Sequence, residues 1–268
     1  MATIQSTDQI GNKLEINFPP KRIISLVPSQ TELLFDLGLY SEIIGLTRFC
    51  IHPADKVKMK EKIGGTKRFN IEKIKSLKPD LIIGNKEENY LEGIEALKQH
   101  FPVWISDIYN LSDAYKMMNE VARITNKVEQ GTRLVNEIGR GFENVSNSDF
   151  KRKGFTAAYF IWRKPYMVAA NNTFIDFMLQ VFGVHNVFKE MDRYPEIEPE
   201  VLKDLQPDFI FLSSEPYSFT EKHIAEFQES LPHSKVILVD GEMFSWYGSR
   251  LKLVPAYFSK LRSEYFKI

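Results

Sequence analysis

One pattern occurs twice in this chain, and it restricts the folds that are open to it. The two copies are IEKIKSLKPDLIIG at residues 71–84 and EPEVLKDLQPDFIFLS at residues 198–213. In each, an acidic residue opens a short amphipathic segment, Leu-x-Pro-Asp ends it, and a β-rich apolar run follows. The offset is 128 residues both from Glu72 to Glu200 and from Asp80 to Asp208. Because proline halts a helix, each copy reads as a helix that feeds a strand, and the chain is predicted to contain two similar halves.

The first half alternates strand and helix patterns. A β-branched run, IISLV, ends at Pro28, and apolar residues then recur at helical spacing up to Gly38. Further strand candidates are IIGLTRF, LIIG and PVWIS. Strands alternating with helices, with Pro and Gly at the joints, favour a mainly parallel sheet with helices on both faces. We expect residues 1–111 to form an N-terminal α/β lobe.

A long helical pattern occupies the middle of the chain. Apolar residues recur at helical spacing from Asp113 to Val145, with no proline among them. This predicts one uninterrupted helix of about 25 to 30 residues, on the order of 40 Å long. We expect residues 112–150 to be an inter-lobe backbone helix with its exit, and residues 151–268 to be a C-terminal α/β lobe. The fold class is therefore α/β, with two similar lobes joined by one long helix.

Composition excludes several classes of protein. The 35 basic and 35 acidic residues give a formal net charge of zero, so no electrostatic footprint indicates nucleic acid or an anionic membrane as partner. No segment approaches the roughly 20 consecutive apolar residues of a membrane span. The first residues lack the pattern of a signal peptide. The expected location is the periplasm or cell envelope if a leader was removed, and otherwise the cytoplasm.

The motifs of common enzymes and metal sites are missing from the sequence. It contains no G-x-S-x-G, no P-loop and no G-x-G-x-x-G. Cys50 and His52 form the only close Cys/His pair, and the other histidines are scattered, so no structural zinc spacing exists. We expect a protein that is not an enzyme and that holds no metal through its own side chains alone.

The order of these segments resembles that of a known family. KRIISLVPSQTELLFDLGLYSEIIGLT, then IGGTKRFNIEKIKSLKPDLIIG, a long central helix and the second Glu-containing unit are arranged as in the class III substrate-binding proteins of ABC importers. The resemblance is greatest to the cobalamin-binding and iron-siderophore-binding members. It implies a monomer that captures a metal-bearing tetrapyrrole or chelate in an inter-lobe cleft. Cobalamin is the first choice, with haem or an iron-siderophore as the alternative.

The same resemblance implies a membrane partner and the residues that meet it. In the family, one glutamate on each lobe docks into arginine pockets on the transmembrane subunits of the importer, and the matching residues are Glu72 and Glu200. A carboxylate met by arginine supplies orientation and association rate. Glu196 and Glu198 compete for the second position. The alternative is that these are solvated carboxylates at helix starts, where the helix dipole favours them.

Ligand contacts are also implied by the resemblance. The aromatic residues among these contacts would supply flat walls for a ring system. Trp162 is two residues beyond Phe160 on a predicted strand, so both side chains would lie on the same face of that strand. The arginines would offer planar donors to carboxylate, phosphate or catecholate oxygens. Thr66 and Asn85 stand where the cobalamin-binding relative has tryptophan, so the first lobe is expected to be more polar. The predicted set is Phe49, Thr66, Arg68, Asn85, Phe160, Trp162, Tyr166, Tyr194, Trp246 and Arg250.

A function from another class remains open on the residues alone. A cytosolic enzyme or a cofactor chaperone could use the same two-lobed fold. The native upstream sequence separates these readings, because an export signal favours transport and a true start at Met1 favours the cytosolic option.

Overall fold

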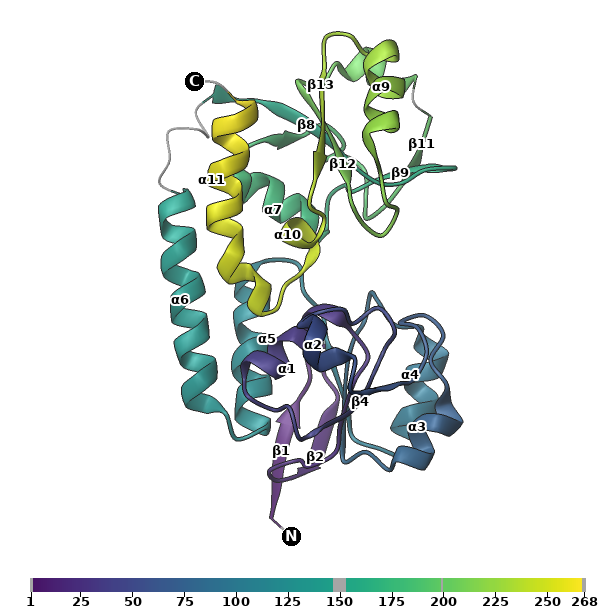
Figure 1. The fold of residues 1–268 in the computed structure, drawn as a ribbon, viewed down its shortest axis with the longest axis vertical. Helices are drawn as coiled ribbons and strands as arrows, with labels where there is room; N and C mark the ends of the chain where they lie inside the picture. The colour runs from purple at the N-terminus through teal and green to yellow at the C-terminus, as the bar shows by residue number, and fades with distance from the viewer. Residues whose placement is uncertain (1, 147–152, 199, 267–268) are drawn as a thin grey trace. The chain divides into compact units, whose positions relative to one another are not determined.

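A computed structural model describes residues 2–146, 153–198 and 200–266. The chain divides into two compact units: unit 1 comprises Met1–Ile138 and Tyr247–Arg250, and unit 2 comprises Gly139–Trp246 and Leu251–Ile268. Each unit has its own sheet, flanked by helices (Figure 1). The sheets are mainly parallel, which confirms the predicted α/β class.

Unit 1 is built on a five-stranded sheet in the order β5-β4-β3-β6-β7, all parallel. Every residue of β3, β6 and β7 is buried, as expected for strands covered on both faces. A separate antiparallel hairpin, β1-β2, precedes this sheet. The elements of unit 1 are β1 (Thr3–Thr7), β2 (Lys13–Asn17), β3 (Ile23–Ser25), α1 (Pro28–Asp36), β4 (Ile43–Leu46), α2 (Ala54–Val57), β5 (Glu61–Lys62), α3 (Ile71–Leu77), β6 (Leu81–Asn85), α4 (Leu91–Lys98), β7 (Val103–Ser106) and α5 (Leu111–Ile124).

Unit 2 is built on a six-stranded sheet. Its path is β11-β9-β8-β12-β13, with β10 also paired to β8. β8, β12, β13 and β10 are parallel, whereas β9 and β11 run antiparallel to their neighbours. The elements after α5 are α6 (Val128–Ser146), β8 (Thr156–Trp162), β9 (Tyr166–Val168), α7 (Phe174–Phe182), β10 (His185–Asn186), β11 (Glu196–Ile197), α8 (Val201–Leu205), β12 (Phe209–Ser213), α9 (Glu221–Ser230), β13 (Lys235–Val239), α10 (Glu242–Ser245), a 3-10 helix (Ser249–Leu253) and α11 (Val254–Tyr265).

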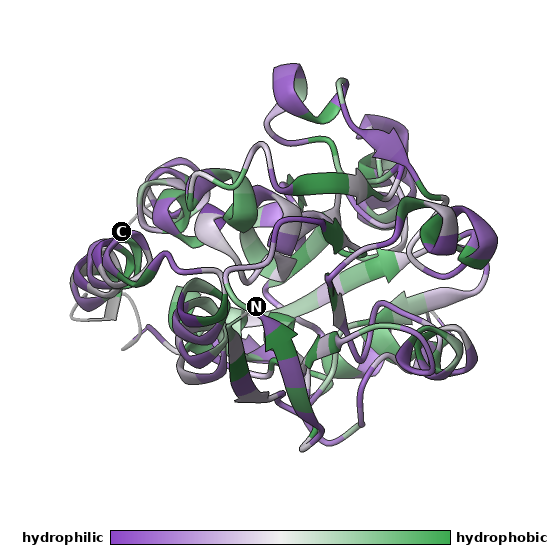
Figure 2. Cartoon of the chain, turned by 90° about the horizontal axis from the view of Figure 1, so that it is seen from below, coloured by the Kyte–Doolittle hydropathy of each residue, from purple (hydrophilic) through white to green (hydrophobic). Residues whose placement is uncertain are grey.

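Alternate residues of the central strands of unit 2 pack on opposite faces of its sheet. Phe160 and Leu212 belong to a core cluster that includes Phe227 of α9. Phe211 faces the other way, where its ring lies 5.9 Å from that of Phe182 in α7. This alternation follows from the two-residue period of a strand. Hydrophobic residues accordingly concentrate on the strands, while the helices carry hydrophilic outer faces (Figure 2).

The duplicated sequence forms the same local structure in both units. α3 and α8 each end at a residue in the left-handed region, Lys78 with φ 46° and Gln206 with φ 43°. The aspartate after the proline then accepts hydrogen bonds from the chain at the start of a neighbouring strand. Asp80 accepts the backbone N–H groups of Lys21 and Arg22 at 2.7 and 2.8 Å, just before β3. Asp208 accepts the N–H and hydroxyl of Thr156, the first residue of β8, at 2.7 and 2.9 Å.

The prediction of one uninterrupted helix from Asp113 to Val145 is wrong. α5 ends before Asn126, which has φ 59°. The N–H of Lys127 donates to the carbonyl of Ala122, and that of Asn126 to the carbonyl of Arg123, the paired bonds of a helix stop built on a left-handed residue. Asparagine tolerates this conformation better than most residues.

The chain then reverses direction at this stop. A Cβ on Gly131 of α6 would lie 2.4 Å from the Cβ of Ala122 in α5, so α6 packs back along α5 (Figure 1). α6 continues from unit 1 into unit 2, which divide at residues 138 and 139. The predicted exit of the long helix includes residues 147–150, which lie outside the described residues.

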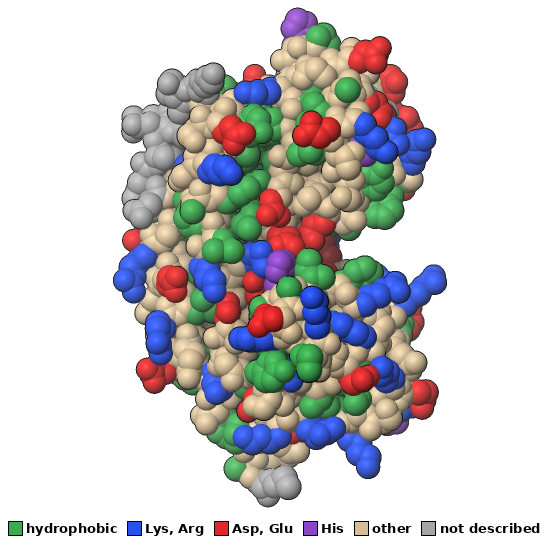
Figure 3. Space-filling view, in the orientation of Figure 1, with side chains coloured by type: hydrophobic (Ala, Val, Ile, Leu, Met, Phe, Trp, Pro, Cys, Tyr) green, Lys and Arg blue, Asp and Glu red, His purple; other side chains and the backbone are tan. Residues whose placement is uncertain are grey.

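No helix in the described part of the chain combines the length and the apolar character that a bilayer crossing requires. On the face shown in Figure 3, acidic and basic side chains are interspersed over unit 1. This distribution agrees with the balanced charge of the sequence.

Candidate functional site

The carboxyl ends of parallel strands are the usual place for a ligand site in an α/β sheet. We call the loops that follow these ends the carboxyl edge of each unit. In unit 1 they follow β3, β4, β5, β6 and β7, and in unit 2 they follow β8, β12 and β13. Most of the predicted ligand contacts fall in these loops or beside them.

Asn85 ends β6 and shapes the carboxyl edge of unit 1. It is 2% exposed. Its amide nitrogen donates to the hydroxyl and carbonyl of Ser106 at 3.0 and 3.2 Å, and its amide oxygen accepts the N–H groups of Glu87 and Glu88 at 2.8 and 3.0 Å. These four bonds use the whole hydrogen-bonding capacity of the side chain. The structure therefore gives Asn85 a loop-forming role and leaves no group on it for a ligand.

Phe49, Thr66 and Arg68 retain accessible surface in unit 1. Phe49 is 50% exposed, and the guanidinium of Arg48 lies 5.0 Å from its ring centroid. Thr66 is half-buried, and its carbonyl accepts a hydrogen bond from Asn89 at 3.1 Å. Arg68 is exposed. An aromatic face thus accompanies polar groups in the loops after β4 and β5.

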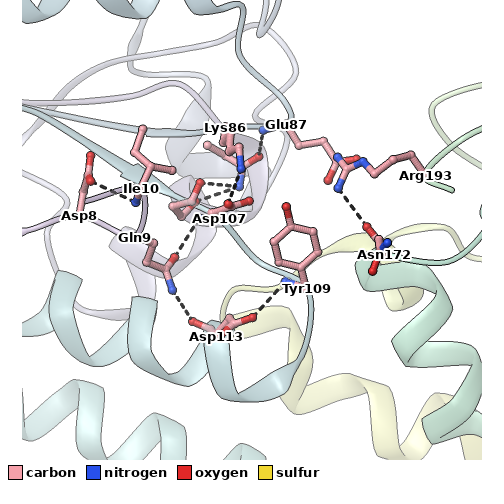
Figure 4. A network of polar contacts seen from close by, with 12 residues as sticks. Asp8, Gln9, Ile10, Lys86, Glu87, Asp107, Tyr109, Asp113, Asn172 and Arg193 are labelled. Atoms are coloured by element: carbon pink, nitrogen blue, oxygen red, sulfur yellow. Dashed lines mark hydrogen bonds and ion pairs between the residues drawn. The ribbon is translucent and has the colours of Figure 1, made fainter. Parts of the chain in front are cut away.

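A polar network fixes the loop after β7 (Figure 4). Gln9 accepts the N–H of Asp107 at 3.1 Å and donates to the carbonyl of Asp113 at 2.9 Å. Lys86 pairs with the Asp107 carboxylate at 2.7 Å, and this hydrogen bond raises the pKa of Lys86. The ammonium group is therefore held in place and charged at neutral pH.

Phe160 and Trp162 of β8, which the sequence placed on one face of the strand, have different surroundings. Phe160 is 0% exposed and lies in the core, whereas Trp162 is 39% exposed. The pairing with β9 shifts between them, because Phe160 lies opposite Val168 and Trp162 opposite Met167. This irregularity interrupts the alternation of side chains. Trp162 presents a surface to solvent, and Phe160 has none to offer a ligand.

Trp162 has a neighbour that sequence reasoning missed. The ring of Tyr217 lies 5.8 Å from Trp162 in an edge-on arrangement. Tyr166 is half-buried, and its hydroxyl donates to Glu226 at 2.7 Å. Arg163 also donates to both oxygens of Glu226, at 2.9 and 2.7 Å. The signal for Tyr217 was its place in SSEPYSF, directly after the apolar run of β12.

Trp246 is tied to a carboxylate at the end of β12. It is 6% exposed, and its indole N–H donates to Glu215 at 2.8 Å, onto the same oxygen that accepts the hydroxyl of Ser245 at 2.7 Å. Burial raises the pKa of Glu215, and the carboxylates of Glu242 and Asp240 add to this rise. Sequence reasoning missed this acidic group, although each of its members directly follows β12 or β13.

The remaining predicted residues have different surroundings. Tyr194 is half-buried, and the Arg193 guanidinium lies 5.8 Å from its ring. That guanidinium also donates to the carbonyl of Asn172 at 3.0 Å (Figure 4). Arg250 is 8% exposed and donates to both carboxylate oxygens of Glu32 at 2.8 and 2.7 Å. Two of its nitrogens serve this internal ion pair, and its role as a ligand donor stays a prediction.

Glu72 lies in the first turn of α3, and Glu200 lies at the N-cap of α8. The Glu72 side chain is 82% exposed and lies 3.1 Å from Lys75. Glu200 is exposed at the N-cap of α8. Glu196 and Glu198 are exposed as well. Among the described residues, no three His, Cys, Asp or Glu side chains are grouped so that they could hold a metal ion.

The surroundings of His223 predict that the stability of unit 2 depends on pH. Its Nδ1 accepts the N–H of Thr220 at 2.9 Å, so the imidazole is neutral there. Burial lowers the pKa of His223, and the charges of Arg163 and Lys222 lower it further. A histidine whose folded pKa lies below the unfolded value of about 6.5 binds its proton more readily when unfolded. Its contribution to stability is complete above that value and is lost as pH falls through the folded pKa.

We expect the free energy of unfolding to fall between pH 7 and pH 5, and to fall less in His223→Gln, which cannot be protonated. Urea denaturation at both pH values measures this. His233→Gln is the control, because His233 is exposed. An unchanged pH dependence in His223→Gln would show that the unfolding does not respond to this imidazole.

Comparison with known proteins gives consistent results. Residues 23–233 match a family described as "Periplasmic binding protein". The chain is 26% identical over 255 residues to the uncharacterized ABC transporter substrate-binding lipoprotein YvrC of Bacillus subtilis, covering 91% of this chain and 80% of that protein. It is 26% identical over 243 residues to the vitamin B12-binding protein of Pectobacterium atrosepticum, covering 87% and 85%.

Solved structures share the fold at lower identity. The periplasmic vitamin B12 binding protein BtuF of Vibrio cholerae superposes with a TM-score of 0.76 at 21% identity, covering 92% of this chain and 99% of that one. A periplasmic heme binding protein from Pseudomonas aeruginosa gives a TM-score of 0.79 at 18% identity, covering 92% and 94%.

Proposed function

Because this chain belongs to the periplasmic binding protein family, we propose that it captures a metal-bearing tetrapyrrole or chelate and delivers it to the transmembrane subunits of an ABC importer. The observation that carries the proposal is the family match over residues 23–233, which includes the five-stranded sheet of unit 1 and every strand of the six-stranded sheet of unit 2 except β13. Relatives named as periplasmic proteins or as a lipoprotein support a place in the cell envelope.

Cobalamin is the first choice of ligand. Among the curated relatives, those of Pectobacterium and Vibrio are named vitamin B12-binding proteins. Haem and ferric siderophores are the alternatives, because proteins named for binding them share the fold. The exposed rings of Phe49 and Trp162 suit a flat macrocycle, since aromatic faces remove large apolar areas from water with few rotatable bonds.

We assign the ligand contacts to the carboxyl edges of the two units, together with Tyr194, which lies before β11. These edges combine aromatic rings with polar groups, as ligand sites generally do. Tyr217 joins the set because it lies beside Trp162, while our proposal leaves out Phe160, Asn85 and Arg250 because of the contacts given above. The proposed contacts are Phe49, Thr66, Arg68, Trp162, Tyr166, Tyr194, Tyr217 and Trp246.

A binding assay with three probes tests the proposal. The purified protein is titrated with cyanocobalamin, haemin and a ferric catecholate chelate, and absorbance and tryptophan fluorescence are followed. We expect one probe to bind saturably with one site per chain and to quench fluorescence, because Trp162 and Trp246 are among the proposed contacts. If a folded protein binds none of the three, the proposed ligand class is incorrect.

A further inference from the structure

The chain enters unit 1 a second time near its C-terminus. It leaves unit 2 after Trp246, contributes Tyr247–Arg250 to unit 1, and returns to unit 2 at Leu251. We call Tyr247–Arg250 the strap. Each of its first two residues and its last has a specific contact in unit 1.

The last residue of the strap is held by a buried ion pair. Arg250 donates from two nitrogens to the two oxygens of Glu32 in α1, and the two side chains are 9% and 13% exposed. A two-pronged pair of this kind fixes both position and orientation. Removing one partner from a buried pair leaves an uncompensated charge, so the contact resists opening.

The first two residues of the strap have little freedom as well. The Tyr247 hydroxyl donates to Glu88 at 2.6 Å, and Tyr247 is 6% exposed. A Cβ on Gly248 would come within 2.3 Å of the carbonyl oxygen of Ser29. Only glycine permits this close approach of two backbones. The strap is therefore seated on α1 and on the loop after β6.

Trp246 directly precedes the strap and is restrained from two directions. Its indole is hydrogen-bonded to Glu215 within unit 2, and its main chain continues into Tyr247, which belongs to unit 1. A displacement of the strap would therefore be transmitted through one peptide bond to the tryptophan. Arg250, which pairs with Glu32, lies four residues further along the chain.

We propose that the strap positions Trp246 for ligand binding, with Glu32 and Arg250 as positioning residues that do not themselves contact the ligand. This inference rests on the proposed function, in which Trp246 is part of the ligand site. A side chain that is ordered before binding loses less conformational entropy when the ligand arrives. Loosening the strap is therefore expected to weaken binding by roughly three- to tenfold.

The test replaces the ion pair without leaving a buried charge. The variant Glu32→Gln/Arg250→Gln keeps two amide side chains in place of the pair. The control, Glu120→Gln/Arg123→Gln, removes another two-pronged pair of unit 1, whose further hydrogen bonds run to Ser6 and Gln5. Both proteins and the unmodified chain are labelled with 5-fluorotryptophan. The chain has three tryptophans, and the Trp246→Phe variant assigns the Trp246 resonance.

In the ligand-free proteins, we expect the strap variant to shift and broaden the Trp246 fluorine resonance and to leave that of Trp104 unchanged. Its affinity for whichever of cyanocobalamin, haemin or the ferric chelate binds the unmodified protein should fall three- to tenfold. The control variant should show neither change. Arg250→Lys, which retains the charge but not the planar fork, gives the same comparison should the double variant fail to fold.

Two results would overturn the inference. One is an unchanged Trp246 resonance in a folded strap variant. The other is a changed resonance with unaltered affinity. If no probe binds even the unmodified protein, the proposed ligand class fails, whereas the ligand-free spectra still decide whether the strap positions Trp246.

Discussion

Replacing both Glu72 and Glu200 by lysine is expected to abolish ligand uptake through the importer while ligand affinity stays as in the unmodified protein. Both carboxylates are exposed, and they lie at the starts of α3 and α8, the helices that the duplicated sequence forms in the two units. A partner with two identical subunits could therefore recognise both with one kind of basic pocket. Charge reversal adds repulsion to the lost pairing, so the effect should be large even if each pair alone is weak.

A matched control separates docking from a general charge effect. Glu129→Lys/Glu190→Lys changes the net charge by the same amount, with one site in each unit. Both control side chains are 87% exposed. Association with the transmembrane complex in proteoliposomes, and uptake of labelled ligand, are then compared among the three proteins. Normal uptake by the Glu72→Lys/Glu200→Lys protein would leave these glutamates as ordinary carboxylates at helix starts.

Two substitutions on β8 are expected to have opposite consequences. Phe160→Ala should lower the free energy of unfolding by about 3–5 kcal/mol, the range for emptying a buried phenylalanine site. The reason is that Phe160 is 0% exposed and packs against Phe227 and Tyr166, with ring centroids 4.8 and 5.8 Å away. Affinity per folded molecule should change little.

Trp162→Ala should instead act mainly on binding. We expect affinity to fall by roughly 1–3 kcal/mol, because an exposed aromatic wall is removed from the proposed site, with a much smaller loss of stability than for Phe160→Ala. Urea denaturation and ligand titration of both variants measure the two effects. A large stability loss with unchanged binding in Trp162→Ala would place this residue outside the ligand site.

The strands of unit 1 could be predicted from the sequence for a physical reason. Strands buried on both faces are almost continuously apolar, and IIS, IIGL and LIIG are such runs. The hairpin β1-β2 is missing from the prediction, although Leu14 and Ile16 alternate with polar residues. Gly11 and Asn12 supplied a turn signal before them.

The break between α5 and α6 shows where hydrophobic periodicity fails. Both helices have apolar faces, with Met118 and Val121 buried in one and Ile138 and Phe142 in the other. The pattern therefore continues across the stop. The signal for the stop is Asn126, which adopts the left-handed conformation that ends α5.

Side-chain pairing explains most of what was missed at the candidate site. The sequence showed arginine within WYGSR, but it could not show Glu32, which lies 218 residues earlier and occupies the guanidinium. In the same way Trp246 could be named as an aromatic contact, whereas its bond to Glu215, 31 residues away, depends on the arrangement of β12 and α10. Residue type indicates which hydrogen bonds and ion pairs a side chain can form, and the fold determines the partner with which it forms them.

The position of the strap also affects the order in which the protein is assembled during synthesis. The first 138 residues leave the ribosome well before Tyr247–Arg250, which complete unit 1. Until then Glu32 lacks the guanidinium of Arg250, and Glu88 lacks the hydroxyl of Tyr247. The N-terminal unit therefore reaches its final packing only after Tyr247–Arg250 have emerged. Domains usually fold one after another from the N-terminus as they emerge, but in this chain the earlier unit has to wait for the later one.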